Sequence, residues 1–319
     1  MVSTRRQLIS LGSVALLGAC AEQAVPSQSP GPTAPVAPTV SVGTTPPSAA
    51  PSSVTTPTPT SATPSATSAT PTASSPATTL PTGGTLKAGA NHSVAAAPYV
   101  YDAGSVHTWL QQGGGPGRKV AFLTFDDGPN NTLTPLMMDT LRQLGVPATF
   151  FVIGKLIAGA ASLPVRAIAD GHSVCLHSYS HDYKTLYPGR VGSGKAIASD
   201  FDKALAAARA ALGAGYATKG YRYPGGHQSW KGLAEGDAAL AARGVSWIDW
   251  NCMSGDADAA RPSTAQGMVN LMASELASGP QVAVVLNHDA DPTGRLTREA
   301  LPGMVGWLRD HGYGFGVIS

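Results

Sequence analysis

Two adjacent carboxylates stand at the end of an apolar run in the chain. Residues 124–129 read TFDDGP, and the run Val120 to Phe125 predicts a buried strand. Adjacent side chains of a regular strand point to opposite faces, so Asp126 and Asp127 can converge on one site only where the backbone bends. Gly128-Pro129 supplies such a bend. Because two ionised carboxylates repel each other, we expect a cation here, with one Asp binding metal and the other transferring protons.

Two histidines follow a second apolar run, Ser173 to Leu176. His177 and His181 are four positions apart, and with one of the two aspartates they form a two-histidine, one-carboxylate set. Zinc favours such a set when a hydrolytic site keeps open positions, and iron(II), cobalt or nickel can also occupy it. We therefore expect a divalent metal, with zinc favoured. Isolated histidines are more often structural or solvent-facing, which is the interpretation we give His172 and His311.

Alternating strands and helices must position these side chains. The pattern of apolar residues and the flanking turns predict strands at Lys119–Phe125, Ala148–Ile153, Ser173–His177, Lys219–Tyr223, Ser246–Asn251, Gln281–Asn287 and Tyr313–Ile318. Helical spacing recurs over Leu133–Leu144 and over Lys195–Leu212, and Ser263 with Gln266 predicts a capping box that opens a Ser263–Ala277 helix. Seven such units favour a parallel α/β arrangement, either a barrel or an open sheet. The polar candidates fall at the carboxyl ends of their strands, where barrel active sites are built.

With these residues in place, the chain resembles the polysaccharide deacetylases of carbohydrate esterase family four. TFDDGP and His177-Ser178-Tyr179-Ser180-His181 match the first two family motifs. The remaining three motifs are similar to Arg222–Gly225, Trp250–Asp256 and Leu286–His288, in chain order. The resemblance implies a distorted (β/α)7 barrel over residues 119–319 and a metal-dependent hydrolase that removes acetyl groups from N-acetylhexosamines.

The resemblance also assigns catalytic roles by motif position. Asp127, His177 and His181 would bind the metal, and Asp126 would be the general base that takes a proton from the attacking water. By the same motif correspondence, three further residues take the remaining catalytic roles. Arg222 would hold Asp126 ionised, His288 would be the general acid, and Asp256 would orient that histidine and raise its pKa.

The substrate side of the site is assigned in the same way. The N–H of Gly225, with the metal, would hold the oxyanion. Trp250 and Leu286 would wall the acetyl pocket, with core packing as the alternative. Tyr223 belongs to the same substrate-binding segment, although strand alternation directs its side chain toward packing. Gly225 replaces an aromatic residue of many members and should open that side of the groove, while Cys175 and Met253 are uncommon at their motif positions.

Composition indicates an exported enzyme on a tether. Charged residues make up 13% of the chain and the net charge is +2, so nothing indicates a nucleic-acid partner. Residues 1–20 are typical of a signal peptide that ends in a lipobox, with Cys20 as the acylation site and Arg5-Arg6 similar to a twin-arginine export signal. We expect a disordered linker at 21–90, an N-terminal extension at 91–118 and the catalytic domain at 119–319, in a monomer held to the cell membrane by lipid and facing the wall.

The expected function is deacetylation of peptidoglycan, at N-acetylglucosamine or N-acetylmuramic acid. The alternatives are a deacetylase of chitooligosaccharide or acetylxylan, which would share the catalytic set, and a non-catalytic glycan-binding lipoprotein of the same fold. Acetate release from these substrates distinguishes them. Cys175 and Cys252 are predicted to be two buried thiols rather than a disulfide.

Overall fold

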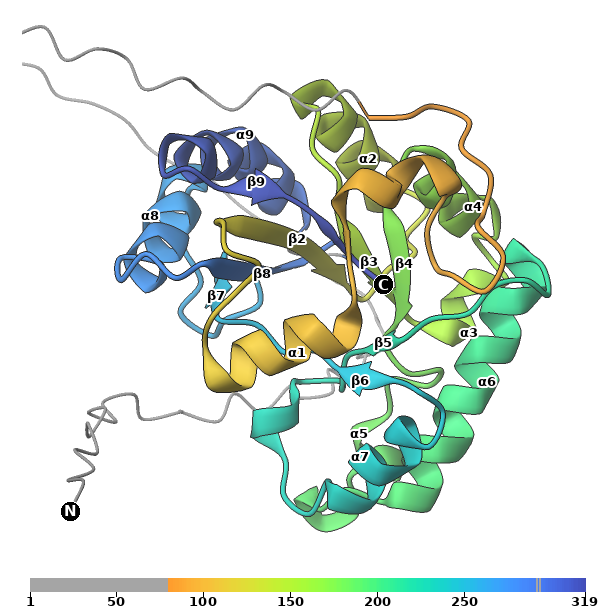
Figure 1. The fold of residues 1–319 in the computed structure, drawn as a ribbon. Coiled ribbons are helices and arrows are strands. Elements are labelled where there is room, and N and C mark those ends of the chain that lie inside the picture. The colour runs from red at the N-terminus through yellow and green to blue at the C-terminus, as the bar shows by residue number, and fades with distance from the viewer. Residues whose placement is uncertain (1–79, 291, 293) are drawn as a thin grey trace, which may run out of the picture. The chain divides into compact units, whose positions relative to one another are not determined.

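Parallel strands and surrounding helices alternate along the chain (Figure 1). The computed structural model describes residues 80–290, 292 and 294–319. Its strands are β1 Val100–Tyr101, β2 Val120–Asp126, β3 Thr149–Val152, β4 Ser173–Leu176, β5 Gly220–Tyr221, β6 Ser246–Trp247, β7 Cys252–Met253, β8 Val282–His288, β9 Gly314–Phe315 and β10 Val317–Ile318. Its α-helices are α1 Ala103–Gln112, α2 Leu133–Leu144, α3 Gly154–Ile157, α4 Ser162–Ala169, α5 Tyr183–Leu186, α6 Gly194–Leu212, α7 Ala234–Ala241, α8 Ala265–Glu275 and α9 Gly294–Asp310, with 3-10 turns at η1 Val94–Tyr99, η2 Pro188–Arg190 and η3 His227–Ser229.

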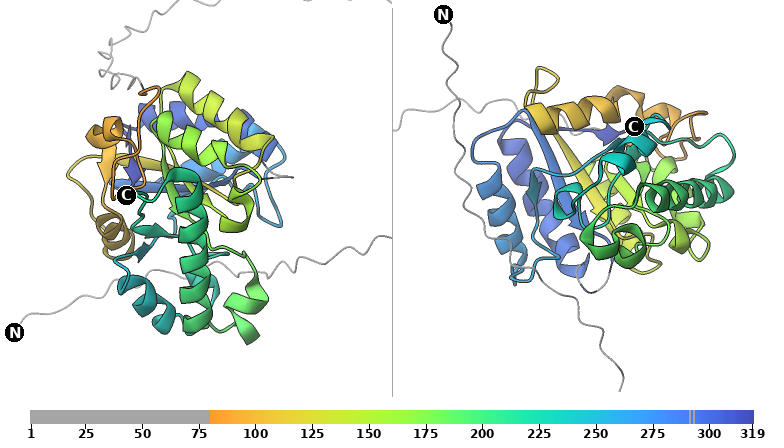
Figure 2. Two further views of the ribbon diagram at one scale, coloured as in Figure 1. Left: turned by 90° about the vertical axis from the view of Figure 1, so that its right-hand side faces the viewer. Right: turned by 90° about the horizontal axis from the view of Figure 1, so that it is seen from below.

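The strands form one curled parallel sheet. Its order is β6-β5-β4-β3-β2-β8-β7, every pairing is parallel, and β9 adds to the start of β2. β10 pairs with β1 in a separate two-stranded sheet. The views in Figure 2 show helices packed around the outside of the curled sheet. This arrangement confirms the predicted distorted (β/α)7 barrel and excludes a flat open sheet.

Strand alternation divides the apolar residues into an inner and an outer cluster. Phe122 of β2 lies in the inner cluster with Phe151 of β3, whereas Leu123 and Phe125 lie in the outer cluster, against the helices. Successive side chains of a strand point to opposite faces, so Asp126, four positions after Phe122, continues the inner row. The charged end of β2 therefore points to the inside of the barrel rim.

The folded domain begins earlier than the sequence predicted. Residues 80–90, which we had assigned to the linker, contact the barrel: Leu80 is buried, the Gly84 N–H donates to the Ala169 carbonyl at 3.0 Å, and the Ala217 N–H donates to the Ala90 carbonyl at 3.1 Å. The composition of residues 80–90 did not predict that they are folded, because they are held to the barrel largely by backbone hydrogen bonds. The remaining linker residues, the signal segment and Cys20 lie outside the described residues.

Several predicted elements have different bounds in the structure. The predicted strand Tyr313–Ile318 divides into β9, which pairs with β2, and β10, which pairs with β1. The predicted strand Ser246–Asn251 ends at Trp247, because the Arg222 guanidinium donates to the carbonyls of Ile248 (2.9 Å) and Asp249 (3.2 Å), which a neighbouring strand would otherwise take. The predicted capping box is wrong: α8 begins at Ala265, and the side chain of Thr264 caps it.

The free cysteines and two isolated histidines lie where the sequence predicted. Cys175 and Cys252 are buried free thiols, as predicted. His172 is buried in the core, whereas His311 is exposed and stacks on Trp307, so the first is structural and the second faces the solvent. Within the described ranges, none of the helices combines the length and apolar character needed to span a bilayer.

Candidate active site

The ends of four strands bring the predicted polar residues to one rim of the barrel. β2 and β8 pair Asp126 with His288 at their last position. β4 and β5 end side by side, immediately before His177 and Arg222. Because all these strands are parallel, their carboxyl ends lie at the same edge, and residues about 160 positions apart in sequence become neighbours.

The backbone bends at the second aspartate, as the sequence predicted. Asp127 has a φ of 73°, in the left-handed region, which turns its carboxylate out of the strand alternation and beside Asp126. The next residue must be glycine, since a Cβ on Gly128 would lie 2.5 Å from the Asp289 carboxylate oxygens. The DDG triplet thus allows a sharp turn against a buried acid.

Asp127, His177 and His181 form a cluster of potential metal ligands. Their ligand atoms all lie within 4.8 Å of one another. The Asp127 Oδ1 atom is 3.5 Å from His177 Nε2 and 3.2 Å from His181 Nε2. The three residues come from two loops at the rim, so the tertiary structure assembles the set that the sequence proposed.

Three observations show that this cluster fits a cation. Asp127 Oδ1 is buried and accepts no hydrogen bond in the described part of the chain. The Nδ1–H of His177 donates to the Arg222 carbonyl at 2.9 Å, which leaves Nε2 with its lone pair toward the cluster. Burial lowers the pKa of His177 to about 3, so this imidazole is neutral, as a metal ligand must be.

A buried acid of α6, which was not among the predicted site residues, holds the loop that carries His177 and His181. Asp200 accepts hydrogen bonds from the N–H groups of Tyr179 (2.5 Å) and Ser180 (3.0 Å). The Ser178 hydroxyl accepts from the His181 N–H at 2.8 Å. These bonds fix the loop between the two histidines. Only one signal pointed to Asp200: it is an acid on the Ala-rich helix that follows the histidine motif.

Asp126 and Arg222 form a buried ion pair. Arg222 Nη1 lies 2.7 Å from Asp126 Oδ1, and both residues are buried. The same Nη1 donates to the Thr124 hydroxyl at 2.8 Å, which in turn donates to the Val285 carbonyl. Burial raises the pKa of Asp126, and Arg222 and His288 oppose that rise. A carboxylate with a raised pKa is a stronger base, so the site favours proton uptake here.

His288 and Asp256 form the second buried pair. The His288 Nδ1 lies 2.8 Å from Asp256 Oδ1, and Asp256 Oδ2 accepts from the His288 N–H (2.8 Å) and from the Thr297 hydroxyl (2.7 Å). Burial alone would lower the pKa of His288, but the hydrogen bond and charge of Asp256 outweigh it, and the pKa rises to about 9. The imidazole is therefore protonated at neutral pH and can donate a proton.

The predicted substrate-binding residues do not all face the groove. Gly225 and Trp250 line a cavity of about 240 Å³ at the rim. Leu286 precedes His288 by two positions on β8, so both side chains lie on the same side of that strand. The placement of Tyr223 in the substrate-binding segment is corrected: its side chain is fully buried in the outer core, and its hydroxyl donates to Asp237 at 2.9 Å.

Gly225 does not open the groove freely. A Cβ at this position would lie 3.3 Å from the Tyr183 hydroxyl and 3.4 Å from the Trp230 ring, so other aromatic residues border the space that a larger side chain would enter. His227, two positions after Gly225, pairs with a different acid of the chain. It contacts Asp237 at 2.9 Å and stacks on Trp247.

Asp289, the acid next to His288, was not among the predicted site residues. It is buried, its Oδ2 accepts from the Thr134 hydroxyl, and its Oδ1 makes no hydrogen bond in the described chain. Burial raises its pKa to about 7. Its position directly after the His288 motif was the signal that could have identified it.

Comparison with known proteins places this geometry in a family. The family described as polysaccharide deacetylase matches residues 113–238. A Bradyrhizobium chitooligosaccharide deacetylase is 35% identical over 181 residues, which cover 56% of this chain and 74% of that protein. A Bacillus cereus peptidoglycan-N-acetylglucosamine deacetylase is 33% identical over 210 residues, covering 63% and 70%. The structure of a Streptococcus mutans CE4 esterase is 39% identical, with a TM-score of 0.69 over 74% of this chain and 98% of that one. The sequence, the fold and the relatives agree, and the chain belongs to the polysaccharide deacetylase family of hydrolases.

Proposed function

We propose that the protein is a metal-dependent N-deacetylase that removes acetyl groups from N-acetylhexosamines of a cell-wall glycan, most readily peptidoglycan. The observation that carries this proposal is the cluster of Asp127, His177 and His181 beside the two buried pairs of the rim. The Bacillus cereus relative is named for the same reaction on peptidoglycan.

Three residues would hold the metal. Asp127, His177 and His181 supply one oxygen and two nitrogen ligands, a donor set that favours zinc, while cobalt, nickel or iron can also bind it. A bound divalent cation supplies Lewis-acid activation of water and of the amide carbonyl.

The two buried pairs divide the proton transfers. Asp126 takes the proton of the attacking water, and the Arg222 guanidinium orients the carboxylate through its 2.7 Å contact. His288 carries its proton at neutral pH and gives it to the departing amine nitrogen, which is a poor leaving group without it. Asp256 holds the imidazole at 2.8 Å and stabilises its charged form.

The groove residues would position the acetamide. The Gly225 N–H makes no hydrogen bond in the described part of the chain, so it remains available to the oxyanion of the tetrahedral intermediate. Trp250 and Leu286 would contact the acetyl methyl. We further propose export and a lipid anchor at Cys20, which would place a monomeric enzyme at the membrane surface facing the wall.

Acetate release tests this function. The full-length protein is incubated with peptidoglycan, chitooligosaccharide and acetylxylan, with and without a chelator, and Asp126→Asn serves as the inactive control. We expect chelator-sensitive release from the N-acetylated glycans and none from the control. Release from acetylxylan alone would replace the proposed function with an esterase activity, and binding without any release would support a non-catalytic glycan-binding protein.

A further inference from the structure

We infer that a cavity beside the His288–Asp256 pair binds a carboxylate-bearing substituent of the glycan, and that Arg261 recognises its charge. This inference rests on the proposed function and deepens it, since it selects a substrate with an acid group close to the acetamide. A neutral chitooligosaccharide lacks that group.

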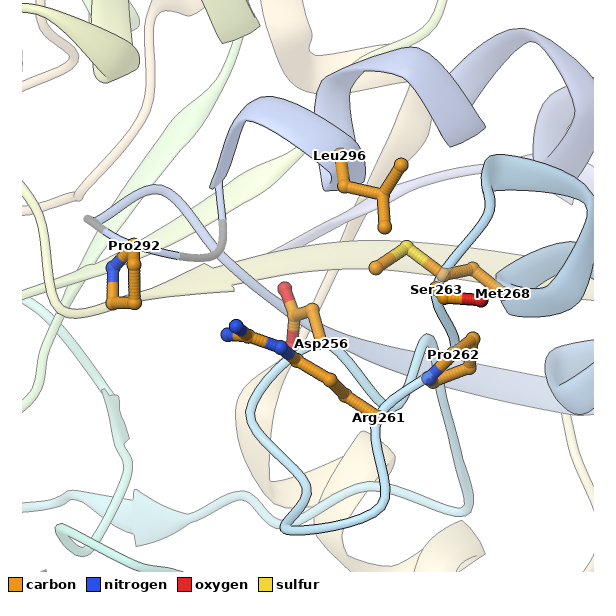
Figure 3. Close-up of a pocket in the computed structure, with 7 residues that line it drawn as sticks. All are labelled: Asp256, Arg261, Pro262, Ser263, Met268, Pro292 and Leu296. Atoms are coloured by element: carbon orange, nitrogen blue, oxygen red, sulfur yellow. The ribbon is translucent and has the colours of Figure 1, made fainter. Parts of the chain in front are cut away.

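The cavity has a volume of about 300 Å³ and lies where the loop after β7 meets α8 and α9. Figure 3 shows Arg261 extending from that loop toward Asp256, with Met268 and Leu296 on the helical side. Asp256 belongs to both places, because its carboxylate lines the cavity and also contacts His288 at 2.8 Å. Asp256 therefore separates the cavity from His288, the proposed proton donor.

The charges around the cavity leave a positive group without a counter-ion. Both Asp256 oxygens already accept hydrogen bonds, and the protonated His288 offsets the carboxylate charge. Arg261 is exposed and forms no ion pair with any residue in the described ranges. Asp258, the acid of the same loop that follows Asp256, neither lines the cavity nor pairs with Arg261. An exposed guanidinium at a cavity wall binds a carboxylate through charge-assisted hydrogen bonds.

The walls suit a small branched acid. Met268, Leu296 and Pro262 are apolar, whereas Arg261 and Ser263 offer hydrogen-bond donors. In a hexosamine the acetamide is on C2, and a substituent on C3 is attached to the next ring carbon. We place a C3 substituent in the space that flanks His288 when the C2 nitrogen reaches that histidine. A lactyl ether at C3 has one methyl and one carboxyl group, and the carboxyl is either free or extended by a peptide that ends in carboxylates.

Ligand binding tests this inference without turnover. In the Asp126→Asn background, the metal-loaded full-length protein is titrated with three glycans of equal length. They are fully N-acetylated, neutral chitotetraose, an N-acetylmuramic-acid-containing tetramer with free lactyl groups, and the same tetramer carrying a stem peptide. Arg261→Gln should weaken the binding of at least one charged glycan about fivefold to tenfold. The affinity for chitotetraose should stay the same, so the ratio of charged-glycan affinity to chitotetraose affinity should fall by the same factor. The charged glycan should also lose affinity as salt rises.

Arg295→Gln is the matched control, because Arg295 is an exposed arginine near the start of α9 that lines a different cavity. It should not change the charged-to-neutral ratio. The arm that responds to Arg261→Gln identifies the source of the carboxylate, lactyl or peptide.

Two results separate this inference from the proposed function. If Arg261→Gln weakens all three glycans alike, or weakens none, the anion site is refuted, while acetate release by the unmodified protein can still support the deacetylase. If the charged glycan binds through Arg261 but no glycan loses acetate, the anion site stands and the proposed function fails.

Discussion

Replacing Asp256 by Asn should move the alkaline limit of activity. The change keeps the shape of the side chain but removes the charge that faces His288 Nδ1 at 2.8 Å. His288 must be protonated to donate to the amine, and a group whose pKa is raised loses its proton only as the pH rises through that raised value. Activity should therefore decline on the alkaline side near the pKa of His288, which the structure puts at about 9.

The magnitude follows from the fraction of protonated imidazole. Without Asp256, burial pulls the pKa of His288 down while Asp126 and Asp127 pull it up, so we take its ordinary value of 6.5 for the variant. At pH 8 an imidazole with a pKa of about 9 is about 90% protonated, and one with a pKa of 6.5 is about 3% protonated. The rate at pH 8 should fall about thirtyfold, whereas the rate at pH 6 should fall less than about twofold.

The assay is a pH profile of kcat from pH 5 to 10 on a chitooligosaccharide, with bound metal measured at each end. Asp258→Asn is the control, because it removes an acid of the same loop that makes no hydrogen bond to His288. An alkaline limb that stays in place in Asp256→Asn, with metal retained, would refute the role of Asp256 in setting the charge of His288.

Three further predictions test the rim. His177→Ala should lower bound zinc and activity together, because two remaining ligands hold the metal weakly, and elemental analysis after dialysis checks this; full zinc occupancy would contradict it. Asp126→Asn should keep its metal and lose turnover, whereas Asp127→Asn should lose the metal itself, and the opposite order would exchange the two roles. Arg222→Met should destabilise the fold by about 3 kcal/mol in urea unfolding, because it leaves a buried carboxylate unpaired. Arg243→Met removes an exposed ion pair and should cost no more than about 1 kcal/mol; equal losses would show that burial of the Arg222 pair contributes nothing.

Much of this site could be predicted from short sequence patterns, because residue type and immediate neighbours determine the chemistry of a side chain. Asp126 and Asp127 before a Gly-Pro turn, and His177 with His181 after a strand, are short patterns whose residue types already require a cation and a bend. The positions of the motif-bearing strands along the chain were also predictable, because each strand has its own apolar run. Resemblance to a family then supplied roles for Arg222, His288 and Asp256 that spacing alone does not determine.

What the sequence could not specify depends on contacts between distant segments. The Arg222 guanidinium donates hydrogen bonds to the backbone carbonyls that follow β6 and thereby shortens that strand. No property of residues 246–251 themselves predicts this early end. Asp200 and Asp289 are ordinary acids in sequence and become structural only when the barrel buries them against the two rim loops.

The sequence by itself determined which groups can carry out the chemistry, since ligand, base and acid are properties of side chains and their immediate neighbours. Only the tertiary structure decided their protonation. The pKa of His288 rises to about 9 and that of His177 falls to about 3, although both are imidazoles at strand ends. The difference arises because one is buried against the Asp256 carboxylate and the other is buried with its Nδ1–H bonded to a neutral carbonyl. A pKa depends on the charges and the solvent around a group, and folding alone sets both.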